Sequence, residues 1–192
     1  MFHRTLRVMC TTAVATSLCL AAALPAQAMA QPPTTGVIDV GFSPDGSAEA
    51  LVLRSLGSAR QSIRLAAYSF TAPAVVRALI DAKKRGVDVA VLVDWKNNVQ
   101  QDSSGKARAA LNLLVNAGIP TRTVAVFPIQ HSKYAVIDGM HVQSGSYNYS
   151  AAAARSNSEN VLVIWNRPDL ARSYLENWQS LFIKGNAYVS GY

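Results

Sequence analysis

The chain has 192 residues, half of them hydrophobic, and a formal net charge of +7. Its two cysteines, Cys10 and Cys19, lie in the first thirty residues, which have the features of an export signal. The mature protein is therefore predicted to contain neither a disulfide nor a cysteine metal site, and the roughly 160 residues that remain suffice for one domain stabilised by its own core.

Three features mark the export signal. Arg4 and Arg7 form a basic start, residues 14–24 form an apolar run, and small residues match cleavage after Ala28 or Ala30. The run is too short to favour a spanning helix, so we expect export to the periplasm or the medium, with no membrane insertion of the mature form. Removal of the signal lowers the net charge from +7 to +5. Such a charge fits an anionic partner, either nucleic acid or an acidic lipid surface, and equally fits ordinary solubility.

Beyond a flexible lead at residues 31–36, strand and helix patterns alternate through one domain at residues 37–192. Strands are predicted at residues 37–42, 62–70, 87–93, 121–127, 134–137, 141–144 and 160–165, and helices at residues 47–56, 73–85, 106–117 and from Pro168 onward. Residues 94–105 are predicted to be a polar loop, and Asp138-Gly139 a hairpin turn. The predicted fold class is α/β, with a mixed, largely parallel sheet flanked by helices.

Residues suited to phosphate chemistry gather in one stretch of this domain. His131, Lys133 and Asp138 follow one another closely, and a Gly-Ser-Tyr-Asn segment occupies residues 145–148. A neutral imidazole can attack phosphorus, while ammonium, hydroxyl and amide groups can hold phosphate oxygens. Because His131 and Lys133 stand two residues apart before a predicted strand, both can address one phosphate. The alternative is a surface histidine beside a solvated lysine.

This pattern resembles the HKD motif that defines the phospholipase D superfamily. The chain is most similar to the small secreted bacterial endonucleases of that superfamily, which carry one motif per chain. Residues 67–71, 84–89 and 159–161 also resemble family segments, so the resemblance covers about residues 37–182. It implies a phospholipase D-like fold.

The resemblance also implies a role for each matching residue. His131 would be the nucleophile that forms a phosphohistidine, and Lys133 and Asn148, joined by Ser146, would bind the phosphate oxygens. Glu159 would orient the imidazole by accepting a hydrogen bond from one ring nitrogen.

The motif also contains residues with an expected structural role. Asp138, with Gly145, is expected to be mainly structural, and an ordinary hairpin aspartate explains Asp138 equally well.

Counting histidines leads to a prediction about assembly. Displacement at phosphorus through a covalent intermediate needs one histidine to attack and one protonated group to donate a proton to the leaving oxygen. After export only His131 and His141 remain, and His141, which follows a Gly-Met pair, is interpreted as a surface hairpin residue. We therefore expect the second catalytic histidine to be His131 of another chain, in a symmetric homodimer.

The remaining expectations concern cofactors and substrate contacts. The sequence has no metal-binding motif, so we expect metal-independent catalysis without a cofactor. Trp95 and Lys96, with Asn97 and Asn98, follow a predicted buried strand and are expected to contact a phosphate backbone and stack a base. A polar surface loop is the alternative.

The leading hypothesis is an exported, metal-independent and nonspecific endonuclease that binds and cleaves DNA, or RNA, as a homodimer. A phospholipase D or cardiolipin-type lipid hydrolase using the same chemistry is the first alternative. A non-catalytic basic nucleic-acid-binding protein is the second.

Overall fold

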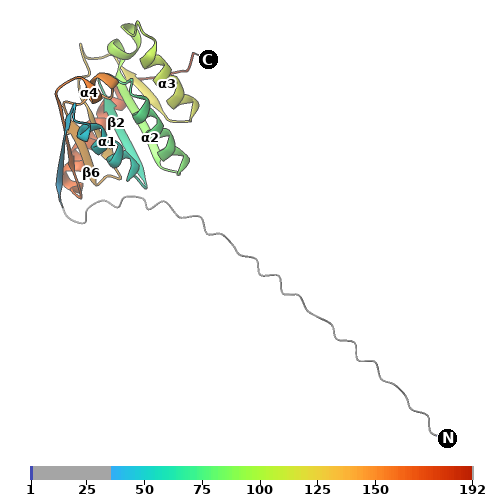
Figure 1. Cartoon of the computed structure of the whole chain (residues 1–192). Helices are drawn as coiled ribbons and strands as arrows, with labels where there is room; N and C mark the ends of the chain where they lie inside the picture. Colours follow the sequence, from blue (N-terminus) through green and yellow to red (C-terminus); the bar gives the residue numbers. More distant parts are fainter. Residues whose placement is uncertain (2–35, 192) are drawn as a thin grey trace.

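The computed structural model describes Met1 and residues 36–191 (Figure 1). The predicted export signal and most of the predicted lead lie outside the described residues. The strands are β1 (Ile38–Ser43), β2 (Ser62–Ala67), β3 (Asp88–Asp94), β4 (Thr121–Val124), β5 (Tyr134–Ile137), β6 (His141–Gly145), β7 (Glu159–Ile164) and β8 (Asn186–Ala187). The helices are α1 (Ser47–Gly57), α2 (Pro73–Lys84), α3 (Lys106–Asn116), α4 (Ala151–Arg155), α5 (Pro168–Lys184) and a π-helix, η1 (Lys96–Gln100).

All eight strands form one sheet in the order β1-β7-β6-β5-β2-β3-β4-β8. The predicted mixed α/β sheet is confirmed, but parallel pairing is limited to β2–β3 and β3–β4, and the other pairs are antiparallel. The expectation that the sheet is largely parallel was therefore wrong, because five of its seven strand pairs are antiparallel. Of the strands joined through a long helix, only β2–β3 and β3–β4 are neighbours in the sheet, whereas the Asp-Gly turn joins β5 directly to β6 and makes that pair antiparallel.

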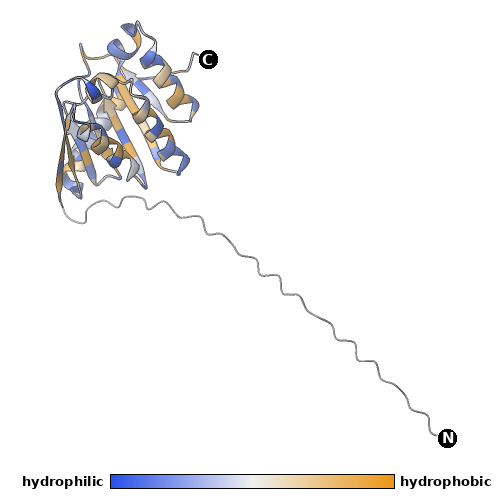
Figure 2. Ribbon diagram, in the orientation of Figure 1, coloured by the Kyte–Doolittle hydropathy of each residue, from blue (hydrophilic) through white to orange (hydrophobic). Residues whose placement is uncertain are grey.

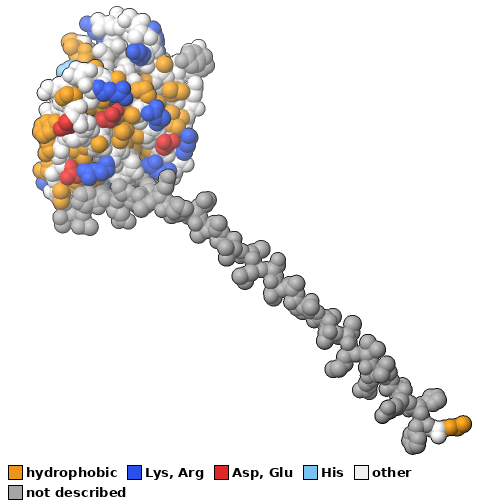
Figure 3. Space-filling view, viewed as in Figure 1, with side chains coloured by type: hydrophobic (Ala, Val, Ile, Leu, Met, Phe, Trp, Pro, Cys, Tyr) orange, Lys and Arg blue, Asp and Glu red, His pale blue; other side chains and the backbone are white. Residues whose placement is uncertain are grey.

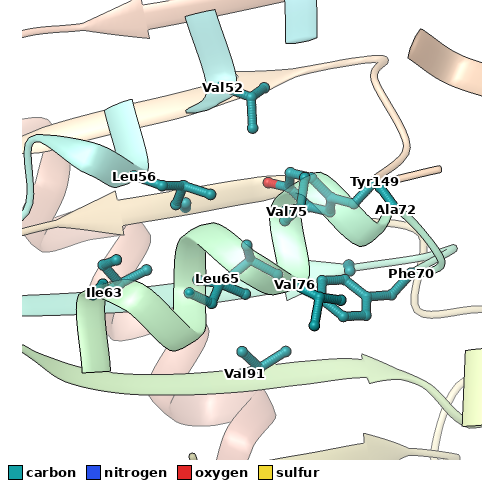
Figure 4. Packing of buried hydrophobic residues seen from close by; sticks show 14 of the residues in the cluster. Val52, Leu56, Ile63, Leu65, Phe70, Ala72, Val75, Val76, Val91 and Tyr149 are labelled. Carbon is teal, nitrogen blue, oxygen red and sulfur yellow. The ribbon is translucent and has the colours of Figure 1, made fainter. Parts of the chain in front are cut away.

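Helices cover both faces of the sheet. Helices α1 and α2 lie in front of it in Figure 1, and α5 packs behind it against β2, β4, β5 and β6. The larger apolar cluster lies under α1, α2 and α3, and Figure 4 shows part of it, where Leu56 of α1 and Val75 of α2 face Leu65 and Val91 of the sheet. The smaller cluster lies under α5 and contains Trp178.

Hydrophobic residues follow this layering. Figure 2 shows them concentrated on the central strands, while the helices also carry hydrophilic residues. On the face seen in Figure 3, Lys and Arg side chains are interspersed with hydrophobic ones and do not form one continuous patch. Within the part of the chain that the structure describes, no helix is long and apolar enough to span a membrane.

Several local predictions differ from the structure. The predicted polar loop at residues 94–105 contains η1, and β4 ends at Val124, which leaves residues 125–129 as an exposed loop. Helix α4 and strand β8 were not predicted, because each is too short to show a periodic pattern. The hairpin turn is confirmed: Asp138 and Gly139 have φ values of 55° and 63°, and they connect the antiparallel β5 and β6.

Candidate active site

A hollow of about 550 Å³ lies where β5 begins and β6 ends. Apart from Gly145, every lining side chain is polar or aromatic, and the lining consists of His131, Ser132, Lys133, Tyr134, Ser144, Gly145, Ser146, Asn148, Tyr174 and Asn177. The hairpin register explains how two separate segments meet here. Tyr134 pairs with Ser144, so the residues before β5 and the residues after β6 lie side by side. The structure thus brings together four of the predicted site residues: His131, Lys133, Ser146 and Asn148.

His131 is exposed to solvent and lies against an aromatic ring that follows β2. The ring centroids of His131 and Tyr68 are 4.5 Å apart, with a tilt of 57°. This contact restricts the imidazole on one side while the ring remains accessible from the hollow. Tyr68 belongs to a segment that resembles the family, but its place beside the histidine could not be read from the sequence.

Lys133 is buried, with 8% of its surface exposed. Its Nζ donates a hydrogen bond to the backbone oxygen of His131 at 2.7 Å and lies 5.0 Å from the centroid of the Tyr68 ring. Burial lowers the pKa of the Lys133 ammonium, and the charge of Glu159 opposes this shift. The lysine is therefore a desolvated cation fixed next to the histidine, an arrangement that strengthens its attraction for an anion.

Asn148 lies between two buried tyrosines that fix the backbone on either side. Tyr149 donates a hydrogen bond from its hydroxyl to Gln143 Oε1 at 2.6 Å, and both Tyr147 and Tyr149 are fully buried. The Oδ1 atom of Asn148 is buried and has no hydrogen-bond partner among the described residues. Asn148 lines the hollow, and its Nδ2 is the part of the side chain that can donate a hydrogen bond to an anion there.

Gly145 allows the close approach that places Ser146. It has a φ of 148°, and a Cβ atom there would lie 2.2 Å from the backbone oxygen of Asn160. Ser146 N donates to that same oxygen at 3.1 Å, and Ser146 Oγ accepts the N–H of Asn160 at 3.0 Å. Only glycine fits this position without displacing β7.

Glu159 contacts the serine and not the histidine. Its Oε2 accepts a hydrogen bond from Ser146 Oγ at 2.6 Å, and its Oε1 accepts one from Asn157 Nδ2 at 3.0 Å. Among the described residues, no hydrogen bond joins Glu159 to His131. The expected orienting contact is therefore missing from the single chain, where both carboxylate oxygens accept hydrogen bonds from Ser146 and Asn157.

Asp138 lies at the end of the hairpin remote from the hollow. Its carboxylate accepts backbone N–H groups from Arg60, Gln61 and Ser62 at 2.7 to 3.2 Å. These bonds join the β5–β6 turn to the start of β2. Asp138 is accordingly placed to hold the sheet together and not to touch a substrate in the hollow.

His141 is buried, which corrects its interpretation as a surface residue. Only 3% of it is exposed, its Nδ1 accepts the N–H of Asn166 at 2.9 Å, and its ring packs against Trp165. Burial lowers its pKa, opposed by the charge of Asp138. The Gly-Met pair suggested exposure, but Trp165 and Asn166, which follow β7, cover the ring. His141 also lies roughly 13 Å along β6 from Gly145, too far to act in the hollow.

Trp95 and Lys96 do not line this hollow. They line a second pocket of about 350 Å³, together with Asp94, Gln100, Val124, Ala125, Phe127 and Pro128. Asn98, grouped with them in the sequence, is fully buried, and its side chain bonds Phe70 N, Tyr68 O and Asp94 O. Asn98 is therefore a structural residue and is not available to a substrate.

Two residues of α5 also line the hollow and were not identified as site residues. Tyr174 packs edge-on against Tyr134 with ring centroids 4.9 Å apart, and Asn177 Oδ1 accepts the hydroxyl of Tyr134 at 2.8 Å. Tyr174 and Trp178 stand four residues apart in the sequence, a helical spacing that indicates only that this side of α5 faces the sheet. Within the described chain, no group of three or more His, Cys, Asp or Glu side chains is placed to hold a metal ion.

Comparisons with known proteins agree with this architecture. A family model described as "Cardiolipin synthase, PLD-like domain" matches residues 52–182. The crystal structure of Nuc, a phospholipase D family member from Salmonella typhimurium, is 48% identical with a TM-score of 0.78, and the match covers 81% of this chain and 100% of that chain. NucT from Helicobacter pylori has a TM-score of 0.66 at 20% identity, over 80% of this chain and 100% of that one, and supports the fold alone. The predicted phospholipase D-like fold is confirmed.

Curated relatives carry lipid-related names. A phospholipase D of Rickettsia bellii is 38% identical over 139 residues, which are 72% of this chain and 66% of that protein. A mitochondrial cardiolipin hydrolase of Xenopus tropicalis is 29% identical over 136 residues, 71% of this chain and 61% of that protein. The chain spans about two thirds of the length of the first of these curated relatives.

Proposed function

The chain belongs to the phospholipase D superfamily of phosphodiester hydrolases, and we propose that it is an exported endonuclease that cleaves nucleic acid without a metal ion. The observation that carries this proposal is the hollow at the β5–β6 hairpin. There an accessible histidine, a desolvated lysine and the side chain of Asn148, whose Nδ2 can donate hydrogen bonds, line one space. Such a space suits a tetrahedral phosphate.

The proposed reaction has two steps. A neutral nitrogen of His131 attacks phosphorus, the bond from phosphorus to the leaving oxygen breaks, and a protonated histidine gives that oxygen its proton. Water then attacks the phosphohistidine, loses its proton to the second histidine, and releases His131 with a phosphate monoester as product. Lys133 Nζ and Asn148 Nδ2 donate hydrogen bonds to the non-bridging oxygens, and Ser146 lies beside them with its hydroxyl donated to Glu159. The lysine offsets the charge of these oxygens as the transition state forms.

The second histidine must come from another molecule of the protein. Of the two histidines in the described domain, His141 is buried and remote, so one chain supplies only His131 to the hollow. A symmetric dimer in which two hollows face each other would bring two copies of His131 together. We propose this homodimer as the active form.

An exposed apolar surface beside the hollow fits such a dimer. Strand register places Ile38, Val40 and Phe42 of β1, with Leu162 of β7, on the face of the sheet that also carries α5. These four side chains are between 38% and 58% exposed. Leu162 pairs directly with Ser144, which lines the hollow, so a second copy seated on this apolar surface would lie against the site.

The dimer also offers a way to form the contact between Glu159 and His131 that is missing from the single chain. Each oxygen of Glu159 accepts one hydrogen bond within its own chain and can accept a second, so Glu159 of the second subunit can take the orienting role implied by the resemblance. We propose that Glu159 holds Ser146 within its own chain and aims His131 across the dimer.

Nucleic acid is the preferred substrate because the hollow lacks an acyl-chain surface. No aliphatic side chain lines it, and the neighbouring pocket contributes aromatic and basic groups. The 48% identity to a structure named Nuc supports the same choice. A lipid hydrolase is the second candidate, favoured by the exposed side chains of Val126, Phe127 and Ile129 just before His131 and by the names of the curated relatives.

One set of assays tests the proposal. The purified mature protein and its His131→Ala variant are incubated in chelator with plasmid DNA, with RNA and with vesicles containing cardiolipin. We expect the native protein to cleave nucleic acid and the His131→Ala variant not to cleave it. Hydrolysis of lipid without cleavage of nucleic acid would establish the second candidate. Equal activity in His131→Ala would refute the mechanism. Activity that appears only with one added metal would refute the proposal that catalysis needs no metal.

A further inference from the structure

The pocket that contains Trp95 and Lys96 has the composition of a base-binding site. It measures about 350 Å³ and lies where β3 and β4 end. Trp95 and Phe127 contribute aromatic rings to its lining, and Lys96 contributes an exposed ammonium group. Phe127 is 40% exposed although it is a large hydrophobic residue. An aromatic ring left open beside a cation is a common platform for unpaired bases.

The pocket is linked structurally to the catalytic histidine. Asp94 lines it and is buried, and its Oδ2 accepts the backbone N–H of Gln130 at 2.8 Å. Gln130 immediately precedes His131 in the chain. Asp94 Oδ1 accepts the N–H of Asn97 at 2.6 Å, so one carboxylate fixes both η1 and the segment before the histidine. This carboxylate therefore links the wall of the pocket to the backbone next to the nucleophile.

The distance between the two sites suits neighbouring nucleotides of one strand. In the sheet, β3 lies two positions from β5, which corresponds to about 10 Å at the usual strand spacing. Tyr68, at the end of the intervening β2, lies against His131 and completes a row of side chains along this edge. A strand whose phosphate occupies the hollow can thus extend along the edge toward the pocket.

The charges around the pocket favour a polyanion. Lys184 Nζ lies 5.6 Å from the centroid of the Phe127 ring, and Lys96 lies on the rim, so two cations border the aromatic surface. Both carboxylate oxygens of Asp94 already accept hydrogen bonds from backbone N–H groups. These cations are suited to contact backbone phosphates on either side of a stacked base.

We propose that this pocket, which we call the base pocket, binds a nucleobase next to the cleaved phosphate and so directs the enzyme to unpaired strands. The inference rests on the proposed nuclease function. Trp95 and Phe127 stack on the base, and Lys96 and Lys184 contact the backbone. A base in a duplex is already stacked and paired, so only an unpaired or opened strand can fill the pocket without an added cost.

The test compares a substrate that has bases with one that has none. Turnover of a single-stranded oligonucleotide and of bis(p-nitrophenyl) phosphate is measured for the native protein, Trp95→Ala and Phe127→Ala. We expect the ratio of kcat/KM for the oligonucleotide to kcat/KM for the small diester to fall about fivefold or more in each variant. Trp95→Phe, which keeps a ring, should restore most of the ratio.

Two further measurements separate stacking from indirect effects. Lys106→Ala and Leu113→Ala remove an exposed charge and an exposed apolar side chain on α3, away from both sites, and should leave the ratio unchanged. An oligonucleotide with abasic positions should lower the ratio for the native protein and lower it no further for Trp95→Ala. An equal loss on both substrates, or a full additional loss on the abasic strand, would overturn the base pocket.

Failure of the nuclease function gives a different result. A native protein that cleaves the small diester but no nucleic acid refutes the proposed function whatever the variants do. If Trp95→Ala and Phe127→Ala then lose hydrolysis of vesicles containing cardiolipin, the same surface contacts lipid and the base pocket is overturned as well. Unchanged oligonucleotide kinetics in both variants, with a nuclease that is active, overturns the base pocket alone.

Discussion

The ring of Tyr68 packs against the ring of His131 with their centroids 4.5 Å apart, although 63 positions separate the two residues in the chain. The same tyrosine ring lies 5.0 Å from Lys133 Nζ. One side chain that follows β2 thus contacts both His131 and Lys133. Tyr68 is accordingly a positioning residue, since it restricts the imidazole and ammonium groups without itself reacting.

This contact leads to a prediction for Tyr68→Ala. Loss of the ring leaves the imidazole free to turn, so kcat on a small diester should fall about tenfold while KM changes less. Tyr68→Phe keeps the ring and should retain most of the activity, since no hydrogen bond of the hydroxyl supports the site among the described residues. A Phe variant as impaired as Ala would show that the hydroxyl matters and the packing does not.

The alkaline limb of activity should report on Lys133. Burial lowers its pKa, so the ammonium loses its proton, and kcat/KM should fall, at a pH below the usual lysine value of about 10.4. In Lys133→Arg the guanidinium stays charged, and this limb should disappear even if the rate is lower. Glu159→Gln removes the charge that opposes the shift and should move the limb to lower pH. A limb that stays in place in both variants belongs to another group.

The sign of the linked stability change excludes unfolding through Lys133 as the cause of that limb. Its folded pKa is below its unfolded pKa, so between the two values the unfolded chain binds more protons. The free energy of unfolding due to this group therefore rises with pH in that window. Activity should be lost while this contribution to stability increases.

Gly145→Ala should be strongly destabilising. The new Cβ would lie 2.2 Å from Asn160 O, and the φ of 148° is one that residues with side chains rarely adopt. We expect a loss of about 2 to 4 kcal/mol in the free energy of unfolding, measured in denaturant, together with loss of activity as Ser146 shifts. Gly57→Ala is the matched control, because nothing lies within 4 Å of its added Cβ and its φ is not positive. Equal stability of the two variants would contradict the assigned role.

Most residues of the hollow could be predicted from local sequence patterns, for a physical reason. His131 and Lys133 precede one strand and residues 145–148 follow the next, and the Asp138-Gly139 turn fixes how those strands pair. Short-range turn chemistry therefore determined a site built from two nearby segments. The polar side chains also matched a known family, which indicated their chemistry.

Contacts between distant segments could not be read in this way. Tyr68 reaches the site through the order of strands in the sheet, and Tyr174 and Asn177 reach it through the packing of α5 across that sheet. His141 was misjudged because its neighbours in sequence suggest a surface turn, whereas Trp165 and Asn166 beyond β7 bury it. In each case burial is determined by a partner more than twenty residues away.

The burial of His141 predicts a loss of stability in acid. Its Nδ1 accepts the N–H of Asn166, a bond that only the neutral ring can accept, and burial lowers its pKa. The stability that it contributes is present above the unfolded value of about 6.5 and is lost as the pH falls through the folded pKa. His141→Asn keeps an acceptor but does not titrate, so its unfolding curve should depend less on pH between neutral and acid conditions. An unchanged pH dependence would assign the acid transition to other groups.

The apolar surface on β1 and β7 should control both assembly and catalysis. Val40→Asp places a charge among Ile38, Phe42 and Leu162, where docking of a second copy would desolvate it. Sedimentation should show a monomer, and activity at low protein concentration should fall about tenfold or more, because each site loses its second histidine. Val189→Asp changes a side chain that is 79% exposed outside this surface and serves as the control. A Val40→Asp protein that is monomeric and fully active would show that one chain completes the reaction alone, and the general acid would then have to be a group other than a second His131.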